Sequence, residues 1–183
     1  RLYALQKYGG IYMDTDVEVV KSFNDLLHLP AFSGFESPLY VPTGIMASEK
    51  GGLWVNQQIK HYDDRPFILP DGTPDTTTNT YVISKSMANA GLLLNNTYQV
   101  CQGMHFFPKD YFSPRQYGKV RSTANTYCIH HFAGSWNPPA RRFKIWFFRT
   151  IVGGTLTEKL VLFKRWLLGK LRLQKNPLKT PLG

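Results

Sequence analysis

The first residues of the chain repeat apolar positions at a helical spacing. Leu2, Leu5 and Tyr8 lie three residues apart, and glycines follow at positions 9 and 10. This spacing predicts one face of a helix, and a glycine directly after such a repeat is a common helix end. We therefore expect a short helix that ends at Gly9.

The next segment has the pattern of two strands separated by a turn. An apolar run at residues 11–13 leads into Asp14-Thr15-Asp16, and a valine-rich stretch follows at residues 17–20. β-Branched residues favour strands, whereas clustered aspartates favour turns. The pattern predicts a strand, an acidic turn and a second strand.

Short strands and helices alternate through the rest of the first 139 residues. The patterns predict strands at 32–35, 44–47 and 125–132, a helix at 56–62 and a turn-rich loop at 65–80. This mixture predicts an α/β fold. Because side chains alternate along a strand, we expect His130 and His131 to face opposite sides of the last strand.

The composition is that of a folded domain. The chain has 183 residues, of which 43% are hydrophobic and 19% are charged, so it is long and apolar enough to bury a core. The longest stretch free of charged residues, Ser86 to Pro108, contains too many amides to cross a bilayer, and we expect no transmembrane helix. Cys101 and Cys128 match no zinc or redox spacing, so we expect two buried thiols.

The net charge of +10 is concentrated at one end of the chain. Residues 1–140 hold 11 basic and 11 acidic residues, whereas residues 141–183 hold 11 basic residues and one glutamate. A neutral domain does not suit a nucleic-acid groove, so we expect no nucleic-acid partner. We predict a domain at 1–139 and a basic, aromatic-rich helical tail at 140–183. The tail either meets an anionic membrane surface through 141–183 or docks on the domain.

The acidic turn is the first candidate for chemistry. Asp14 and Asp16 are separated by one residue, and in an extended segment two such carboxylates lie on the same side and can reach one ion. Mg²⁺ and Mn²⁺ accept carboxylate oxygens as ligands. The alternative for an isolated pair of this kind is a solvated turn.

The surroundings of this pair resemble a known signature. Arg-x₃-Leu-x₂-Tyr-Gly-Gly-Ile-Tyr-Met-Asp-Thr-Asp-Val, from Arg1 to Val17, resembles the DXD motif of glycosyltransferase family 32. The resemblance implies a GT-A-type fold that binds a nucleotide-diphosphate sugar. It implies that Asp14 and Asp16 are catalytic residues that hold Mn²⁺ or Mg²⁺ on the donor diphosphate, and that Asp14 and Arg1 belong to the donor site. The family's first nucleotide-binding strands would precede Arg1, so we expect an N-terminally truncated domain.

A second motif, His131-Phe-Ala-Gly-Ser-Trp, resembles the closing motif of retaining, metal-dependent sugar transferases. The resemblance implies that His131 is a third metal ligand and that Ser135 and Trp136 belong to the donor site. His130 is then expected to be structural. Core packing of Trp136 and turn capping by Ser135 remain alternatives.

Together these features predict a glycosyltransferase. The resemblance implies metal-dependent transfer of a hexose from a nucleotide sugar to a glycan or lipid-linked glycan acceptor, with retention of configuration, in polysaccharide biosynthesis such as that of a capsule. Thr76 to Asn79 are candidates for acceptor contact, and we assign no catalytic base. We expect a cytoplasmic enzyme held peripherally at the inner face of a bacterial cell membrane, or a Golgi lumenal enzyme in a eukaryote. The alternative is a non-catalytic module that binds a membrane surface or a polyanion and in which the acidic pair is structural.

Overall fold

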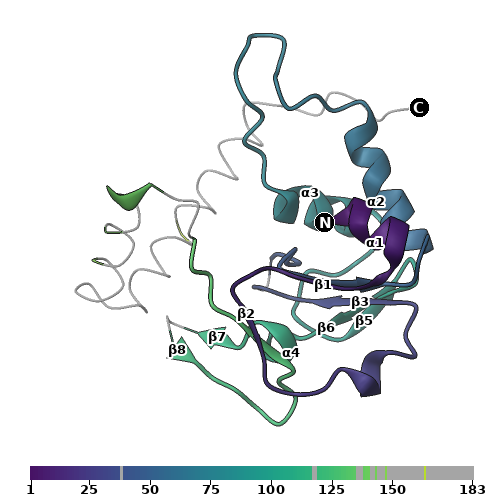
Figure 1. The fold of residues 1–183 in the computed structure, drawn as a ribbon, viewed down its shortest axis with the longest axis vertical. Helices are drawn as coiled ribbons and strands as arrows, with labels where there is room; N and C mark the ends of the chain where they lie inside the picture. The colour runs from purple at the N-terminus through teal and green to yellow at the C-terminus, as the bar shows by residue number, and fades with distance from the viewer. Residues whose placement is uncertain are drawn as a thin grey trace. The chain divides into compact units, whose positions relative to one another are not determined.

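The computed structural model describes residues 1–37, 39–116, 119–134 and 138–140, and the single residues 143, 147 and 163 (Figure 1). The chain divides into two compact units, residues 1–115 with 120–132, and residues 116–119 with 133–183. Ser135, Trp136 and nearly all of the tail expected at 140–183 lie outside the described residues. The predictions made for them stay predictions.

The larger unit mixes helices and strands, as the sequence pattern predicts. Its helices and strands are, in chain order, α1 (Leu2–Tyr8), β1 (Gly10–Met13), β2 (Val17–Val19), the 3₁₀ helix η1 (Asn24–Leu26), β3 (Ala31–Gly34), β4 (Ile45–Ser48), α2 (Leu53–Asp63), α3 (Asn79–Asn89), β5 (Gln99–Cys101), β6 (Met104–Phe107), α4 (Lys109–Phe112) and β9 (Cys128–His130). The short strands β7 (Arg115–Gln116) and β8 (Lys119–Val120) precede β9 in the chain. The mixed α/β class is confirmed and fits a glycosyltransferase-like fold.

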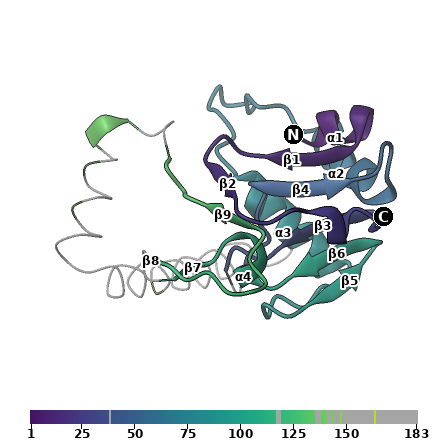
Figure 2. The ribbon, with the colours of Figure 1, turned by 60° about the horizontal axis from the view of Figure 1, so that its bottom comes forward.

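Five strands form the main sheet in the order β1-β4-β3-β6-β5 (Figure 2). The pair β3–β6 is parallel, and the other three neighbouring pairs are antiparallel. Strand β2 leaves this sheet and pairs antiparallel with β9 in a separate two-stranded sheet. The acidic turn therefore joins the edge strand of the main sheet to a strand of the smaller one.

Helices cover both faces of the main sheet. Helices α1, α2 and α3 lie on one face, and α4 lies on the other (Figure 1). One apolar cluster joins the first three helices to the sheet through Leu5, Val55 and Ile83, among others. Because both faces are covered, every residue of β3 and β4 is buried, and these strands lack the polar alternation of a half-exposed strand.

The cluster on the α4 face is rich in aromatic rings. Phe32 of β3 and Phe112 of α4 stack with their ring centroids 5.9 Å apart, and Phe23 and Tyr127 stack with centroids 5.7 Å apart. Stacked aromatic pairs add stabilisation beyond the area that they bury. This cluster packs the segment that leads into β9 against the sheet, and it thereby fixes the strand that carries the two histidines.

Both cysteines are free thiols. Cys128 is buried, and burial raises the pKa of its thiol to about 12. Cys101 is half-buried, so the expectation of two buried thiols is correct for Cys128 alone. Among the residues that the structure describes, no helix has the length and apolar character needed to cross a membrane.

Candidate metal centre

The acidic pair lies in a turn between β1 and β2. The Val17 N–H donates to the Asp14 carbonyl at 3.1 Å and closes the turn. The Asp14 N–H donates to the carbonyl of Gly44 at 2.8 Å, which ties the turn to the residue before β4. The two carboxylates therefore meet across a turn, and the extended geometry expected for this pair is not the one observed.

Arg1 holds the first carboxylate in place. As the N-cap of α1, it lies beside the end of β1, and its Nη2 is 2.8 Å from Oδ1 and 3.0 Å from Oδ2 of Asp14. Its Nη1 donates to Thr43 Oγ1 at 2.5 Å. The Tyr12 hydroxyl donates to Asp14 Oδ1 at 2.8 Å. The structure thus places Arg1 directly at the acidic pair.

The surroundings of Tyr12 keep its hydroxyl protonated. Burial and the neighbouring Asp14 carboxylate raise the pKa of this phenol, although the Arg1 guanidinium acts in the opposite direction. A protonated phenol remains a hydrogen-bond donor to the carboxylate. Tyr12 therefore orients Asp14 without adding negative charge.

His130 completes the cluster from a segment more than 110 residues further along the chain. Strand β9 pairs with β2 so that His130 lies opposite Val17, next to the turn. Its Nε2 is 3.3 Å from Oδ1 of Asp16. Burial lowers the pKa of His130, although the Asp16 and Asp14 carboxylates oppose the shift. The imidazole is therefore neutral at pH 7, which is the form that binds metal ions.

The ring of His130 is held between two neighbours. A Cβ atom at Gly44 would lie 2.6 Å from Cε1 of the imidazole, so only glycine leaves room for the ring. On another side the ring stacks on Phe132, with centroids 4.0 Å apart. These contacts fix the imidazole beside Asp16 before any ligand arrives.

The N–H of His131 donates to the Asp16 carbonyl at 2.9 Å, but its imidazole is not part of the cluster, so the geometry favours His130 over the predicted His131 as the third ligand. The Nε2 of His131 is 2.8 Å from Oε2 of Glu18, and 43% of its side chain is exposed. The two histidines do have different environments, as strand alternation predicts. Alternation cannot tell which of them meets Asp16, because Asp16 lies in the turn before β2 and not in the strand. The residue expected to be structural, His130, is the one at the acidic pair.

Asp14, Asp16 and His130 form a candidate cation site. One ligand atom from each residue lies within 4.8 Å of the other two, and no other group of this kind occurs in the described part of the chain. Two carboxylates and a neutral imidazole suit a divalent cation, and the nitrogen ligand favours Mn²⁺ over Mg²⁺, which prefers oxygen alone. The donor set fits the ion that the DXD resemblance implies.

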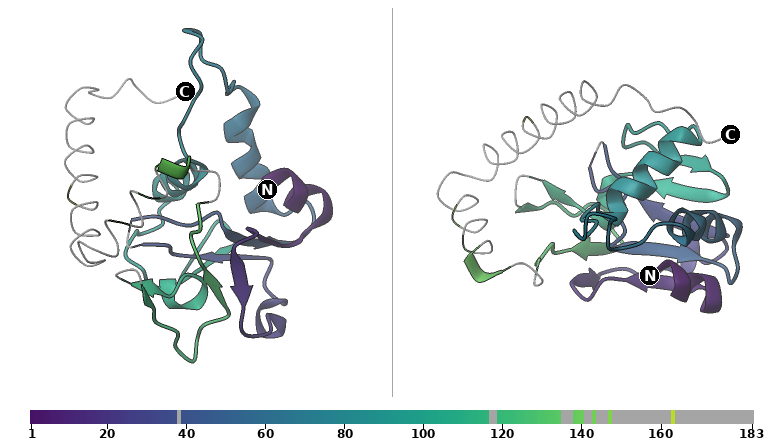
Figure 3. Two further views of the ribbon diagram at one scale, coloured as in Figure 1. Left: turned by 60° about the vertical axis from the view of Figure 1, so that its left-hand side comes forward. Right: turned by 90° about the horizontal axis from the view of Figure 1, so that it is seen from above.

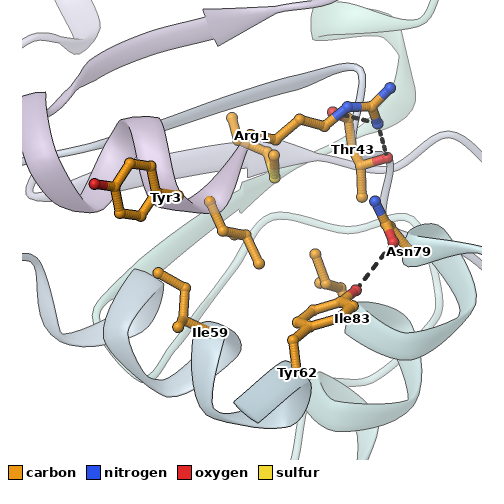
Figure 4. A pocket seen from close by; sticks show the side chains of 9 residues that line it. Arg1, Tyr3, Thr43, Ile59, Tyr62, Asn79 and Ile83 are labelled. Carbon is orange, nitrogen blue, oxygen red and sulfur yellow. Dashed lines mark hydrogen bonds between the residues drawn. The ribbon is translucent and has the colours of Figure 1, made fainter. Parts of the chain in front are cut away.

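Arg1 also lines a pocket of about 300 Å³ (Figure 4). The side chains that line it come from α1, β4, α2, α3 and the segment before β4, and they are Arg1, Leu2, Tyr3, Thr43, Met46, Ile59, Tyr62, Asn79 and Ile83. Of the suggested acceptor contacts Thr76 to Asn79, only Asn79 reaches the pocket. Apart from Arg1 and Asn79, the sequence pattern gave no signal for the residues that line the pocket, because they come together only in the tertiary structure.

Comparison with known proteins locates the similarity at the N-terminus. Residues 1–32 match the family model described as a glycosyltransferase sugar-binding region containing a DXD motif. The match includes Arg1 and both aspartates of the candidate cation site. No solved structure matches the chain.

Three fungal proteins are similar over part of their length. The chain is 36% identical over 61 residues to inositol phosphoceramide mannosyltransferase 3 of Schizosaccharomyces pombe, which covers 33% of this chain and 17% of that protein. It is 37% identical over 71 residues to mannosyl phosphorylinositol ceramide synthase SUR1 of Saccharomyces cerevisiae, covering 37% and 19%. It is 32% identical over 73 residues to glucan organizing enzyme 1 of Cryptococcus neoformans, covering 34% and 20%.

These matches confirm the predicted resemblance to DXD glycosyltransferases of the family 32 type, and they support assigning the chain to a glycosyltransferase. The matched segments span only about a fifth of the length of the curated relatives. The activity, substrates and partners of the whole protein are therefore proposals.

Proposed function

We propose that this chain is the metal- and donor-binding part of a glycosyltransferase that moves a hexose from a nucleotide-diphosphate sugar to a glycan or lipid-linked glycan acceptor. The observation that carries the proposal is the convergence of Asp14, Asp16 and His130 within 4.8 Å, beside a segment that matches a sugar-binding DXD region. Because two of the relatives are named for mannosyl transfer, mannose is the first hexose to test.

Each residue of the site has a separate task in this proposal. Asp14, Asp16 and His130 hold a divalent cation, preferentially Mn²⁺, and a bound cation stabilises the negative charge of a diphosphate leaving group. Arg1 and Tyr12 fix the orientation of Asp14. The guanidinium adds positive charge beside the cation site, where a leaving group gains negative charge.

The stereochemistry and the pathway are further parts of the proposal. No described side chain is assigned as a nucleophile or a base, so we propose retention of configuration with the leaving phosphate accepting the acceptor proton. A role in polysaccharide biosynthesis, including that of a capsule, rests on the family resemblance alone. Ser135 and Trp136 are proposed as donor contacts on the same ground.

Metal titration and donor turnover test the function directly. We expect Mn²⁺ to bind to the protein at one site by isothermal titration calorimetry, more tightly than Mg²⁺. We expect Mn²⁺-dependent hydrolysis or transfer with one member of a panel of GDP- and UDP-sugars. Asp14→Asn should lower both the Mn²⁺ affinity and the turnover of the nucleotide sugar. Asp25 is an exposed carboxylate on η1, and Asp25→Asn should lower neither quantity. Equal metal binding by both variants would contradict the site.

The competing function is a non-catalytic module that binds a membrane surface or a polyanion. It predicts no turnover with any nucleotide sugar at any Mn²⁺ concentration. The peripheral location at an anionic membrane surface, at the inner face of a bacterial cell membrane or in the Golgi lumen, is a separate proposal that rests on the charge of residues 141–183. Co-sedimentation with anionic vesicles, with and without those residues, tests it.

A further inference from the structure

The Arg1 guanidinium is held by two different partners. Its Nη2 lies 2.8 Å from Oδ1 of Asp14, whereas its Nη1 donates to Thr43 Oγ1 at 2.5 Å and to the Thr43 carbonyl at 3.2 Å. Figure 4 shows the two hydrogen bonds to Thr43. Asp14 follows β1 and Thr43 precedes β4, so the guanidinium bridges two separate segments of the chain.

The pairing of two strands brings these segments together. Strands β1 and β4 are antiparallel, and Met13 at the end of β1 lies opposite Ile45 at the start of β4. The right panel of Figure 3 shows the N-terminus next to β1, and α1 packs against both strands. Because Arg1 is the N-cap of α1, its side chain begins beside the paired strand ends and can contact the residues that flank both of them.

The contact with Asp14 becomes weaker when a cation binds. The exposed fractions of the two side chains are 33% for Arg1 and 19% for Asp14, and ion pairs that water reaches contribute little to stability. A divalent cation on Asp14 also shares the carboxylate oxygens that Arg1 contacts. Since the cation and the guanidinium are both positive, they repel each other at this short distance. Asp14 alone therefore does not keep Arg1 beside a bound cation.

Thr43 is a partner that the cation does not take from Arg1. The ligand groups of the candidate cation site are two carboxylates and an imidazole, whereas Thr43 offers a neutral hydroxyl and a carbonyl. Its side chain is only 5% exposed, and a β-branched side chain has few rotamers. The backbone beside it is also fixed, because the Gly44 carbonyl accepts the Asp14 N–H at 2.8 Å. Thr43 therefore holds Nη1 in a constant position.

We propose that Thr43 is a positioning residue that keeps the Arg1 guanidinium beside the cation site while a divalent cation is bound. Both positive charges then act on the same diphosphate. Without the Thr43 hydroxyl, repulsion by the cation moves the guanidinium away from the site. This inference rests on the proposed function, and it adds to that function a residue that acts through Arg1 alone. The hydroxyl of Thr43 carries the effect, and its methyl group does not.

Calorimetry with two probes tests the proposal. Mn²⁺ is titrated into the free protein, and the Mn²⁺ complex of inorganic pyrophosphate is titrated into the Mn²⁺-loaded protein. Thr43→Val removes the hydroxyl with little change in volume. We expect it to keep the Mn²⁺ affinity within about threefold of the wild type, because Tyr12 and the backbone still orient Asp14. Its affinity for the pyrophosphate complex should fall at least about fivefold, because a hydrogen bond to a charged group is lost.

Thr43→Ser is the conservative variant that separates the hydroxyl from the methyl group. It keeps the hydroxyl, so its affinity for the pyrophosphate complex should lie within about twofold of the wild type. Equal losses of this affinity from Thr43→Val and Thr43→Ser would overturn the proposal, because packing of the side chain and not its hydroxyl would then be responsible.

Two controls distinguish positioning of Arg1 from a general loss of stability. In the Arg1→Gln background, Thr43→Val should lower the affinity for the pyrophosphate complex no further, because Thr43 acts through Arg1. Thr126 is another buried threonine, 4% exposed, and its hydroxyl donates to the Asp110 carbonyl at 2.8 Å. Thr126→Val should lower the melting temperature and leave the affinities for Mn²⁺ and for the pyrophosphate complex as they are.

The same titrations separate the possible failures. If the wild type does not bind Mn²⁺, or binds Mn²⁺ but not its pyrophosphate complex, the proposed function fails and this inference fails with it. If the wild type binds both and Thr43→Val binds both equally well, only this inference fails and the proposed function stands. If Thr43→Val lowers the Mn²⁺ affinity as much as the affinity for the complex, or acts equally in the Arg1→Gln background, Thr43 supports the site without acting through Arg1 and the assignment is wrong.

Discussion

The candidate metal centre and the 64–78 loop are built in opposite ways. The metal centre combines a turn near the N-terminus with His130, and only the pairing of β2 with β9 brings them together. The loop is held by contacts between residues no more than ten positions apart, such as that between Arg65 and Asp75. The first is a product of the whole fold, whereas the second is a product of local sequence.

This difference has consequences for substitutions. In the metal centre each residue depends on neighbours from distant segments, as His130 depends on the absence of a side chain at Gly44. A substitution at one residue of the metal centre should therefore alter the position of another residue of the same site. In the loop, a substitution should alter the loop alone and leave the cation site as it is. The predictions below test this contrast.

The largest effect is expected from Asp16→Ala. The substitution removes a carboxylate that is only partly buried, so the fold should persist while Mn²⁺-dependent turnover falls by more than about 100-fold. Turnover is measured with the preferred nucleotide sugar, and circular dichroism checks the fold. Turnover near that of the wild type would show that the acidic turn is a solvated surface feature.

The two histidines come next. His130→Ala should weaken Mn²⁺ binding by about 10- to 100-fold, because it removes a neutral imidazole that faces Asp16. His131→Ala should change the affinity by less than about threefold, since its imidazole contacts Glu18. Calorimetric titration of both variants decides the order. A larger loss of Mn²⁺ affinity from His131→Ala than from His130→Ala would instead support His131, the residue that the sequence motif favours, as the metal ligand.

Gly44→Ala should have a smaller effect through His130. The new methyl group would meet the imidazole at 2.6 Å and displace it, so Mn²⁺ affinity should fall about tenfold. The double variant Gly44→Ala/His130→Ala provides the control, because without the ring the methyl group has nothing to displace. An equal loss from Gly44→Ala in both backgrounds would mean that glycine acts on the backbone and not on His130.

The loop should respond only locally to Asp75→Asn. Hydrogen bonds from Thr77 and then from Arg65 lower the pKa of Asp75 to about 2. Since the folded pKa lies below the ordinary value of 3.8, the charged contacts persist above pH 4 and are lost as the pH falls through about 2. Amide hydrogen exchange should therefore become faster in the loop of the variant at pH 7. The wild-type loop should lose the same protection, measured relative to the intrinsic exchange rate at each pH, only near pH 2.

Mn²⁺ affinity is the control for this last variant. It should match the wild type, because no described contact joins the loop to Asp14, Asp16 or His130. A loss of metal affinity in Asp75→Asn would show that the loop and the metal centre are coupled, and the contrast between the two regions would then be wrong.

Several elements of the fold could be predicted from the sequence. The helix at Leu2–Tyr8 and the strands on either side of the acidic turn follow from the spacing of apolar residues and from the glycines at positions 9 and 10, which end the helix. Helix α2 was predicted within three residues at its start. Helix α3 and strands β5 and β6 were not predicted, because this part of the chain has no clear periodicity and its residues are fixed by packing against the sheet.

The sequence by itself determined the acidic pair, its place after an apolar strand, the resemblance that gives it a function, and the concentration of positive charge after residue 140. These are local properties, because they depend on residue type and on spacing over a few positions. Only the tertiary structure decided that the imidazole of His130 and not that of His131 lies at Asp16, and that Arg1 both contacts Asp14 and lines a pocket. The reason is physical. The register of β2 on β9 and the packing of three helices on one sheet join residues far apart in the chain, and no local pattern records which of them will meet.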